Sequence, residues 1–181
     1  MALVKLNARS ATALDATVLT GNLPSISGAS LTGISGGKVN QITFSQSADA
    51  DYIGTNSSSY VTTGQSVSIT PSATNSKIQI NVYTGRPYSS SQSQSLAINI
   101  YSSATSAYLG TGDNMALIRV NSASGVLYSP FNIQWIDSPN TTSAITYTPF
   151  MKSSSSWSYF AHQDSVWHIQ ATEILAWQYI N

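Results

Sequence analysis

The stretch Lys77-Ile78-Gln79-Ile80-Asn81-Val82-Tyr83 alternates apolar and polar side chains without a break. Because successive side chains of a β-strand point to opposite faces, this alternation predicts a half-buried strand with Ile78, Ile80 and Val82 directed inward. Leu96-Ala97-Ile98-Asn99-Ile100-Tyr101 repeats the pattern one turn-rich segment later. Together the two stretches predict a β-sheet that covers a hydrophobic core on one side.

Segments of similar texture, rich in Ile, Val, Tyr and Thr, lie on both sides of these two strands and are separated by Ser-, Asn-, Gly- and Pro-rich turns. The final segment could form a helix over 171–177, but its alternation favours a strand covered on both faces. About nine short strands and no convincing helix predict an all-β fold, an antiparallel β-sandwich of jelly-roll type. The remaining strands are expected at residues 39–44, 65–70, 116–121, 131–136, 144–148, 157–161 and 166–180. Trp135, Trp167 and Trp177 have aliphatic neighbours in these strands and are expected to pack in the core or between subunits.

The composition narrows the classes of partner. The 181 residues include 7 basic and 7 acidic side chains and no cysteine, and only 8% are charged, against roughly 25% in an ordinary soluble domain. A net charge of zero gives no long-range attraction to nucleic acid or to an anionic membrane. No apolar run approaches the ~20 residues of a membrane helix, and none at the N-terminus predicts a secretory signal. We therefore expect neither nucleic-acid binding nor membrane insertion.

The residue composition of the chain changes near Gly36-Gly37. We expect an anchor or stalk segment at residues 1–37 and a β-sandwich head at 38–181. The first segment has no aromatic residue, and Leu14–Gly21 aligns with Ile26–Gly33 in a short internal repeat. Its aliphatic residues fit neither a helix nor a strand, and they cannot cover one another within one chain. They are Leu14, Val18, Leu19, Leu23, Ile26, Leu31 and Ile34. The segment could form a strap across its own head or a flexible tail, but the interpretation that we favour is burial between several copies of the chain.

Catalytic and metal-binding patterns are scarce. His162, Asp164 and His168 would share one face of an unbroken strand, but residues 163–165 resemble a turn, which separates them. The acidic pair Asp49 and Asp51 precedes a Ser-rich loop and is best explained by solvation of a turn. No nucleophile elbow or complete phosphate-binding loop occurs. The sequence therefore predicts no enzyme, no metal site and no cofactor.

Aromatic side chains beside turns are the remaining candidates for ligand binding. Aromatic rings stack on the apolar faces of sugars, while Asn, Gln and Ser side chains bind the sugar hydroxyls. The alternative is that each ring packs in the core or between subunits. The aromatic residues in this position are Tyr88, Tyr101, Tyr108, Tyr128, Trp157 and Tyr159. Among them, Tyr88, Trp157 and Tyr159 are the predicted ligand contacts.

Residues 11–34, Ala-Thr-Ala-Leu-Asp-Ala-Thr-Val-Leu-Thr-Gly-Asn-Leu-Pro-Ser-Ile-Ser-Gly-Ala-Ser-Leu-Thr-Gly-Ile, resemble the linker motif of tailed-phage fibre and virion structural proteins, notably from marine and cyanobacterial phages. Shorter blocks that echo this family lie at 38–41, 67–72, 136–143 and 171–174. Residues 84–115 match no part of it that we can place. The resemblance implies a homotrimeric virion appendage whose N-terminal part attaches it or forms a stalk.

The resemblance leads us to expect a non-enzymatic short fibre or spike on the virion surface, with a trimeric head that adheres to the host. Its partners would be two further copies of itself, another virion protein of the capsid or tail through residues 1–37, and a glycan of the host envelope. Because 181 residues leave almost no shaft, the alternative is a capsid decoration, cement or head-fibre protein that binds no receptor. A polysaccharide-cleaving spike is disfavoured by the shortage of acidic residues and by the lack of a long repeated β-helix.

Overall fold

The computed structural model describes residues 39–47, 52–89, 94–110, 114–120, 127–154, 156–163 and 165–175. All of them belong to the second of two units into which the chain divides, residues 35–181. The expected anchor segment at 1–37, with the seven aliphatic residues named above, lies outside the described residues, as does Trp177.

The described residues form strands that pair antiparallel in three sheets, and they include no helix, so none that could cross a membrane. The first sheet has the order β1-β14-β5-β11. In the second, β12 pairs with β3, β4 and β7, and β7 also pairs with β8 and β9. A small third sheet has the order β10-β6-β13-β2. The strands are β1 Val39–Ser47, β2 Ile53–Thr55, β3 Val61–Thr62, β4 Val67–Ile69, β5 Lys77–Thr84, β6 Tyr88–Ser89, β7 Gln94–Ser102, β8 Ala107–Tyr108, β9 Ala116–Val120, β10 Leu127–Tyr128, β11 Phe131–Asp137, β12 Ile145–Ser153, β13 Ser158–Ala161 and β14 Trp167–Ile174.

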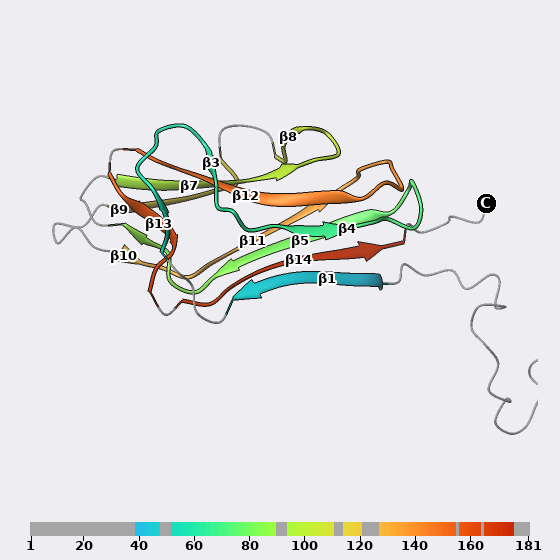
Figure 1. Cartoon of the computed structure of the whole chain (residues 1–181), viewed down its shortest axis with the longest axis horizontal. Coiled ribbons are helices and arrows are strands. Elements are labelled where there is room, and N and C mark those ends of the chain that lie inside the picture. The colour runs from blue at the N-terminus through green and yellow to red at the C-terminus, as the bar shows by residue number, and fades with distance from the viewer. Residues whose placement is uncertain are drawn as a thin grey trace, which may run out of the picture. The chain divides into compact units, whose positions relative to one another are not determined.

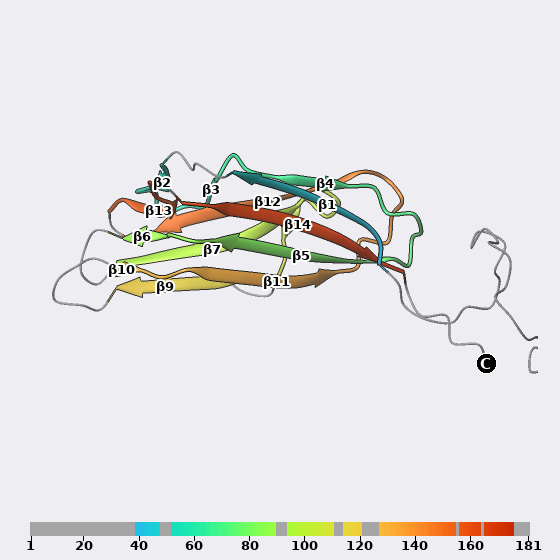
Figure 2. The same cartoon turned by 90° about the horizontal axis from the view of Figure 1, so that it is seen from below.

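The two larger sheets lie as two layers around the core, a sandwich-like arrangement (Figures 1 and 2). As predicted, Ile78, Ile80 and Val82 of β5 are fully buried, because the alternating pattern directs every second side chain between the sheets. The facing strand β7 contributes Ile98 and Ile100 in the same way. The prediction of an all-β, antiparallel fold is confirmed, and so is the preference for a strand over a helix at residues 171–174.

One predicted core residue is only half covered. Trp135 is 37% exposed, and its strand β11 forms the edge of the first sheet. A Cβ added to Gly110 would lie 3.9 Å from its ring, and Gly110 has a φ of +85° that other residues rarely adopt. Trp135 therefore does not lie in the core of the single chain, and its packing between subunits stays a prediction, whereas Trp167, on the interior strand β14, is 5% exposed as expected.

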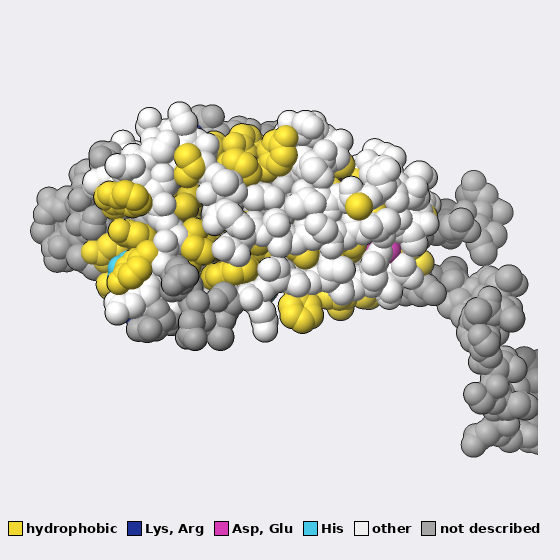
Figure 3. Space-filling model, in the orientation of Figure 1, with side chains coloured by type: hydrophobic (Ala, Val, Ile, Leu, Met, Phe, Trp, Pro, Cys, Tyr) yellow, Lys and Arg dark blue, Asp and Glu magenta, His cyan; other side chains and the backbone are white. Residues whose placement is uncertain are grey.

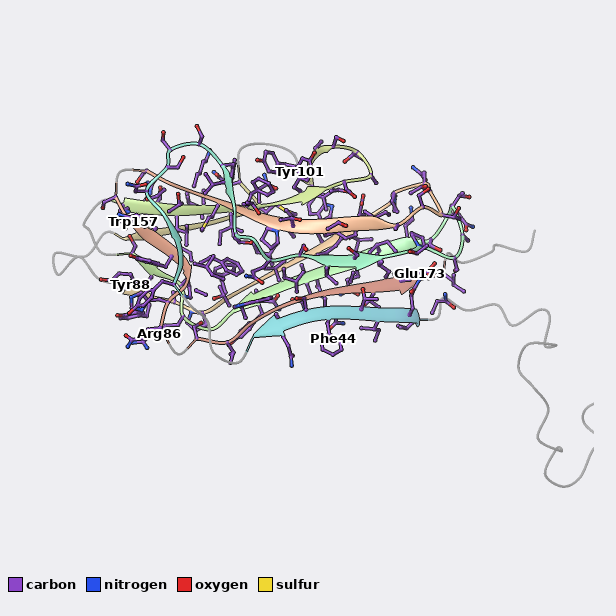
Figure 4. The ribbon with its side chains drawn as sticks, in the orientation of Figure 1. Phe44, Arg86, Tyr88, Tyr101, Trp157 and Glu173 are labelled. Atoms are coloured by element: carbon purple, nitrogen blue, oxygen red, sulfur yellow. The ribbon has the colours of Figure 1, made fainter. Side chains whose placement is uncertain are left out.

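The sandwich has two chemically different ends. At one end Val39, the first described residue, pairs with Ile174, and Glu173 lies nearby (Figure 4). The third sheet lies at the opposite end, with β10 and β13 at the left of Figure 1. The described chain therefore enters the sandwich at the end far from the third sheet.

Candidate ligand-binding site

The third sheet brings tyrosines from three strands into one row. In its register, Tyr128 of β10 pairs with Tyr88 of β6, and Tyr88 pairs with Tyr159 of β13. Side chains at paired positions stand beside each other on the same face of a sheet. The ring centroids are accordingly 5.0 Å apart for Tyr88 and Tyr128 and 5.7 Å apart for Tyr88 and Tyr159, within the range of aromatic contacts.

A glycine occupies the next position of this row. Gly54 of β2 pairs with Tyr159, and a Cβ at Gly54 would lie only 2.3 Å from Cδ1 of the tyrosine ring. Glycine therefore allows the ring of Tyr159 to lie across the backbone of β2. This close approach fixes the orientation of the ring.

The histidine ring of His162, just after β13, sits among these tyrosines. Its centroid lies 4.4 Å from that of Tyr88, 4.7 Å from that of Tyr52 and 5.2 Å from that of Tyr159. The Nδ1 atom is buried without a hydrogen-bond partner among the described residues. Burial, and then the positive charge of Arg86, lower the pKa of His162 below its usual value. The imidazole is consequently neutral at neutral pH.

We call this group, with Trp157, the aromatic tip; its members are Tyr52, Tyr88, Tyr128, Trp157, Tyr159 and His162. Three of its side chains form an exposed rim, with exposed fractions of 56% for Tyr52, 50% for Trp157 and 44% for Tyr128. Figure 3 shows hydrophobic side chains gathered around the histidine at this end of the molecule. The tip thus presents aromatic surface to solvent over a base of contacting rings.

Polar and charged groups border the aromatic tip. The guanidinium carbon of Arg86 lies 4.7 Å from the ring centroid of Tyr128, and its Nη1 donates a hydrogen bond of 3.1 Å to the carbonyl of Gln163. The indole of Trp157 stacks on Tyr159 with centroids 6.0 Å apart and an interplanar angle of 21°. Flat rings beside a fixed hydrogen-bond donor can stack on the apolar face of a sugar and bind one of its hydroxyls.

The three predicted ligand contacts therefore lie together, although Tyr88 is distant in sequence from Trp157 and Tyr159 (Figure 4). Two other surface tyrosines named from the sequence, Tyr101 and Tyr108, belong to a different group on the second sheet, 5.7 Å from each other. The sequence did not indicate Tyr52, His162 or Arg86 as neighbours. No local pattern identifies them, because sheet pairing over long separations brings them together.

The structure keeps the two histidines apart. Strand β13 ends at Ala161 and β14 begins at Trp167, so no unbroken strand carries both. His168 stacks on Tyr83 with centroids 5.3 Å apart. No group of three potential metal ligands occurs among the described residues, and Asp49, Asp51 and Asp164 lie outside them.

Glu173 is buried at the opposite end of the sandwich and has no exposed surface. Its Oε1 accepts hydrogen bonds from the backbone N–H of Ser72 at 2.7 Å and from the hydroxyls of Ser72 and Ser76 at 2.8 and 2.6 Å. Its Oε2 accepts from the side-chain amides of Asn40 and Gln41, both at 2.8 Å.

Asn40 and Gln41 are consecutive, yet both reach Oε2 of Glu173. They can do so because the register of β1 shifts between Val39 and Gln41, which breaks the usual alternation of side chains. Burial alone would raise the pKa of Glu173, but the hydrogen bonds to the ionised form outweigh it and lower the pKa to about 2. This carboxylate stays charged and holds the fold together, a role that the sequence did not reveal.

Comparison with known proteins does not assign the chain to a family. No family model matches the chain, and no curated protein matches it significantly. The resemblance of residues 11–34 to phage linker motifs therefore stays an expectation, and the geometry of the described residues is the basis for the function proposed below.

Proposed function

We propose that this chain is a non-enzymatic adhesion protein of the virion surface that binds a glycan of the host envelope through the aromatic tip. The observation that carries the proposal is the assembly of Tyr88, Trp157 and Tyr159 into one partly exposed cluster. The sequence indicated these residues by their chemistry, and the pairing of β6 with β13 in the folded protein brings Tyr88 to Tyr159 and the neighbouring Trp157.

The chemistry of the tip supports a neutral sugar as ligand. Its rings offer apolar faces, and its histidine is uncharged at neutral pH for the reasons given above. The carboxylates that the structure describes, Asp137 and Glu173, make structural hydrogen bonds away from it, Asp137 to the hydroxyl of Tyr147 at 2.8 Å.

Assembly into a trimer through residues 1–37 is the second part of the proposal. The outer side of β1, which directly follows this segment in sequence, exposes Val39, Ile42 and Phe44 by 57%, 53% and 64%. Exposed apolar side chains of this extent favour contact with another protein surface. Three copies of the jelly-roll head would present three weak sites, and the resulting avidity would strengthen attachment without any new contact.

The test is adsorption of the full-length protein to an array of neutral oligosaccharides and to bacterial cells of candidate hosts. Trp157→Ala and Tyr88→Ala are expected to weaken binding about tenfold, which corresponds to about 1.4 kcal/mol, the scale of one aromatic contact. Ile136→Ala is the control, because Ile136 is 59% exposed on β11, at the end of the sandwich opposite the tip, and belongs to none of the proposed sites.

Unchanged adsorption in both tip variants would reject adhesion through this site, and no adsorption of the wild type would favour the decoration or cement role. Release of reducing sugar from a retained glycan would instead favour the polysaccharide-cleaving alternative.

A further inference from the structure

The outer face of the second sheet carries a hollow that is separate from the aromatic tip. A shallow cavity of about 220 Å³ is lined by residues that include Ser95, Ala97, Asn114, Arg119, Lys152 and Ser154. We call it the basic trough.

The register of the sheet explains the shape of the trough. Ala97 of the middle strand β7 pairs with Lys152 of β12 on one side and with Leu117 of β9 on the other, and Ser95 pairs with Arg119. Paired side chains share one face of the sheet. Because the middle strand has short side chains and both neighbours have long ones, the surface sinks along β7.

The charge of the trough is unusual for this molecule. Only four basic side chains occur among the described residues, and two of them, Arg119 and Lys152, line it. Neither described acidic residue, Asp137 or Glu173, belongs to its lining. In a chain with zero net charge, this arrangement concentrates positive charge at one place, and it favours an anionic ligand.

Aromatic rings continue from the trough along the same face. The ammonium of Lys152 lies 4.7 Å from the ring centroid of Tyr60, and the hydroxyl of Tyr60 donates a hydrogen bond of 2.9 Å to Oδ1 of Asn114. Tyr60 and Tyr108 are 4.9 Å apart, and Tyr108 lies 5.5 Å from Phe150. Figure 4 shows Tyr101, which contacts both Tyr108 and Phe150, in this region.

We propose that the basic trough binds a saccharide that carries a carboxylate, such as a uronic acid unit of an acidic polysaccharide. A guanidinium matches the two oxygens of a carboxylate in a bidentate pair, so Arg119 receives this group and Lys152 adds a second positive charge. The hydroxyls of Ser95 and Ser154 border the ring hydroxyls, and Tyr60 provides a flat surface for the neighbouring sugar. This site does not depend on the aromatic tip or on its function.

The experiment is calorimetric titration of the full-length protein with an oligosaccharide containing glucuronic acid and with the same oligosaccharide after reduction of its carboxyl groups. The acidic form is expected to bind at least tenfold more tightly, and its affinity should fall as the salt concentration rises. Arg119→Gln and Lys152→Gln should each weaken binding of the acidic form about tenfold.

Lys77→Gln is the control for the loss of one positive charge, because Lys77 donates a hydrogen bond to Ser138 and does not line the trough; it should leave the affinity unchanged. Equal binding of the reduced oligosaccharide, or an Arg119→Gln variant that binds as well as the Lys77→Gln variant, would overturn the proposal. Displacement of the oligosaccharide by equimolar inorganic phosphate would contradict its assignment to a sugar. If Trp157→Ala rather than Arg119→Gln abolished binding, the acidic sugar would belong to the aromatic tip instead.

Discussion

At the scale of single residues, Glu173 connects three parts of the chain that are distant in sequence. Its carboxylate on β14 receives hydrogen bonds from the start of β1 and from the segment between β4 and β5. A buried charge with this many donors remains ionised, and its loss leaves several donors without an acceptor. The end at which the described chain enters the sandwich is therefore fixed by one side chain.

We expect Glu173→Gln to lower the free energy of unfolding by about 3 kcal/mol at pH 7, because a neutral amide presents an NH2 group to donors that require an acceptor. The pKa of Glu173 is depressed in the folded state to about 2. Its contribution is therefore complete above the unfolded pKa of about 4.3 and is lost as the pH falls toward 2. Urea unfolding at pH 7 and pH 3 measures the difference, which should be smaller at pH 3. A variant as stable as the wild type at pH 7 would contradict this role.

We expect His162 to cause a second pH dependence of the stability. Its sign is opposite to that expected for a histidine with an acidic partner. Because its pKa is lowered by burial and by Arg86, the folded protein resists protonation. Below the usual pKa of about 6.5 the unfolded chain binds a proton that the folded chain does not, so stability falls with the pH. Urea unfolding at pH 7.5 and 5.5 should show this loss in the wild type and a smaller loss in His162→Gln. Equal losses in the two proteins would exclude His162 as the cause.

At the scale of elements, the long strands and the short strands β4 and β13 could be predicted from the sequence, and the two-residue strands could not. Strands such as β5 and β7 contain several alternating pairs, whereas β6, β8 and β10 have two residues each and no measurable period. Their pairing is set by the longer strands around them. Tyr88 and Tyr128 of the aromatic tip lie on two such strands, which explains why the ligand contacts could be chosen by chemistry but not placed together.

The strand β12 shows a further limit of local rules. Its expected end at residue 148 preceded a proline, yet the strand continues to Ser153. The carbonyl of Pro149 accepts a hydrogen bond from the backbone of Thr63, and in an antiparallel strand the nitrogen faces the same side. Pro149, which has no N–H, therefore lies on β12 between the residues that pair with β4 and those that pair with β3. The pairing of β12 with β7 is undisturbed.

Gly54 provides a test of how the third sheet orients the aromatic tip. We expect Gly54→Ala to displace the ring of Tyr159 and to destabilise the protein by about 1–3 kcal/mol, the usual effect of overpacking. It should also weaken binding to any glycan that the tip retains. The control is Gly85→Ala, whose Cβ would meet the hydroxyl of Tyr83 at 3.3 Å, a contact that a flexible side chain can relieve. Thermal unfolding and glycan binding measure both effects, and equal behaviour of the two variants would contradict this account of the ring.

At the scale of the whole molecule, the sandwich separates its surfaces by chemistry. The aromatic tip, the basic trough and the exposed apolar side of β1 lie on different strands. The proposed functions divide accordingly into adhesion, acidic-sugar binding and contact between copies.

Removal of residues 1–37 tests the proposed assembly. We expect the full chain to form a trimer and the truncated chain to lose it, because about 1.5–3 kcal/mol for each fully buried aliphatic side chain would no longer offset the cost of association. Light scattering coupled to size exclusion measures the mass, and circular dichroism checks that the head remains folded. An unchanged mass in a folded truncated protein would favour a strap across the head over an intermolecular stalk.

The most direct measurement of the central claim is calorimetric titration of the oligosaccharide that the neutral array retains best into the full-length protein and its Trp157→Ala variant. We predict saturable binding that the substitution weakens about tenfold, while Ile136→Ala binds like the wild type. Equal affinities of the wild type and Trp157→Ala, or no saccharide retained by the wild type, would contradict adhesion through the aromatic tip.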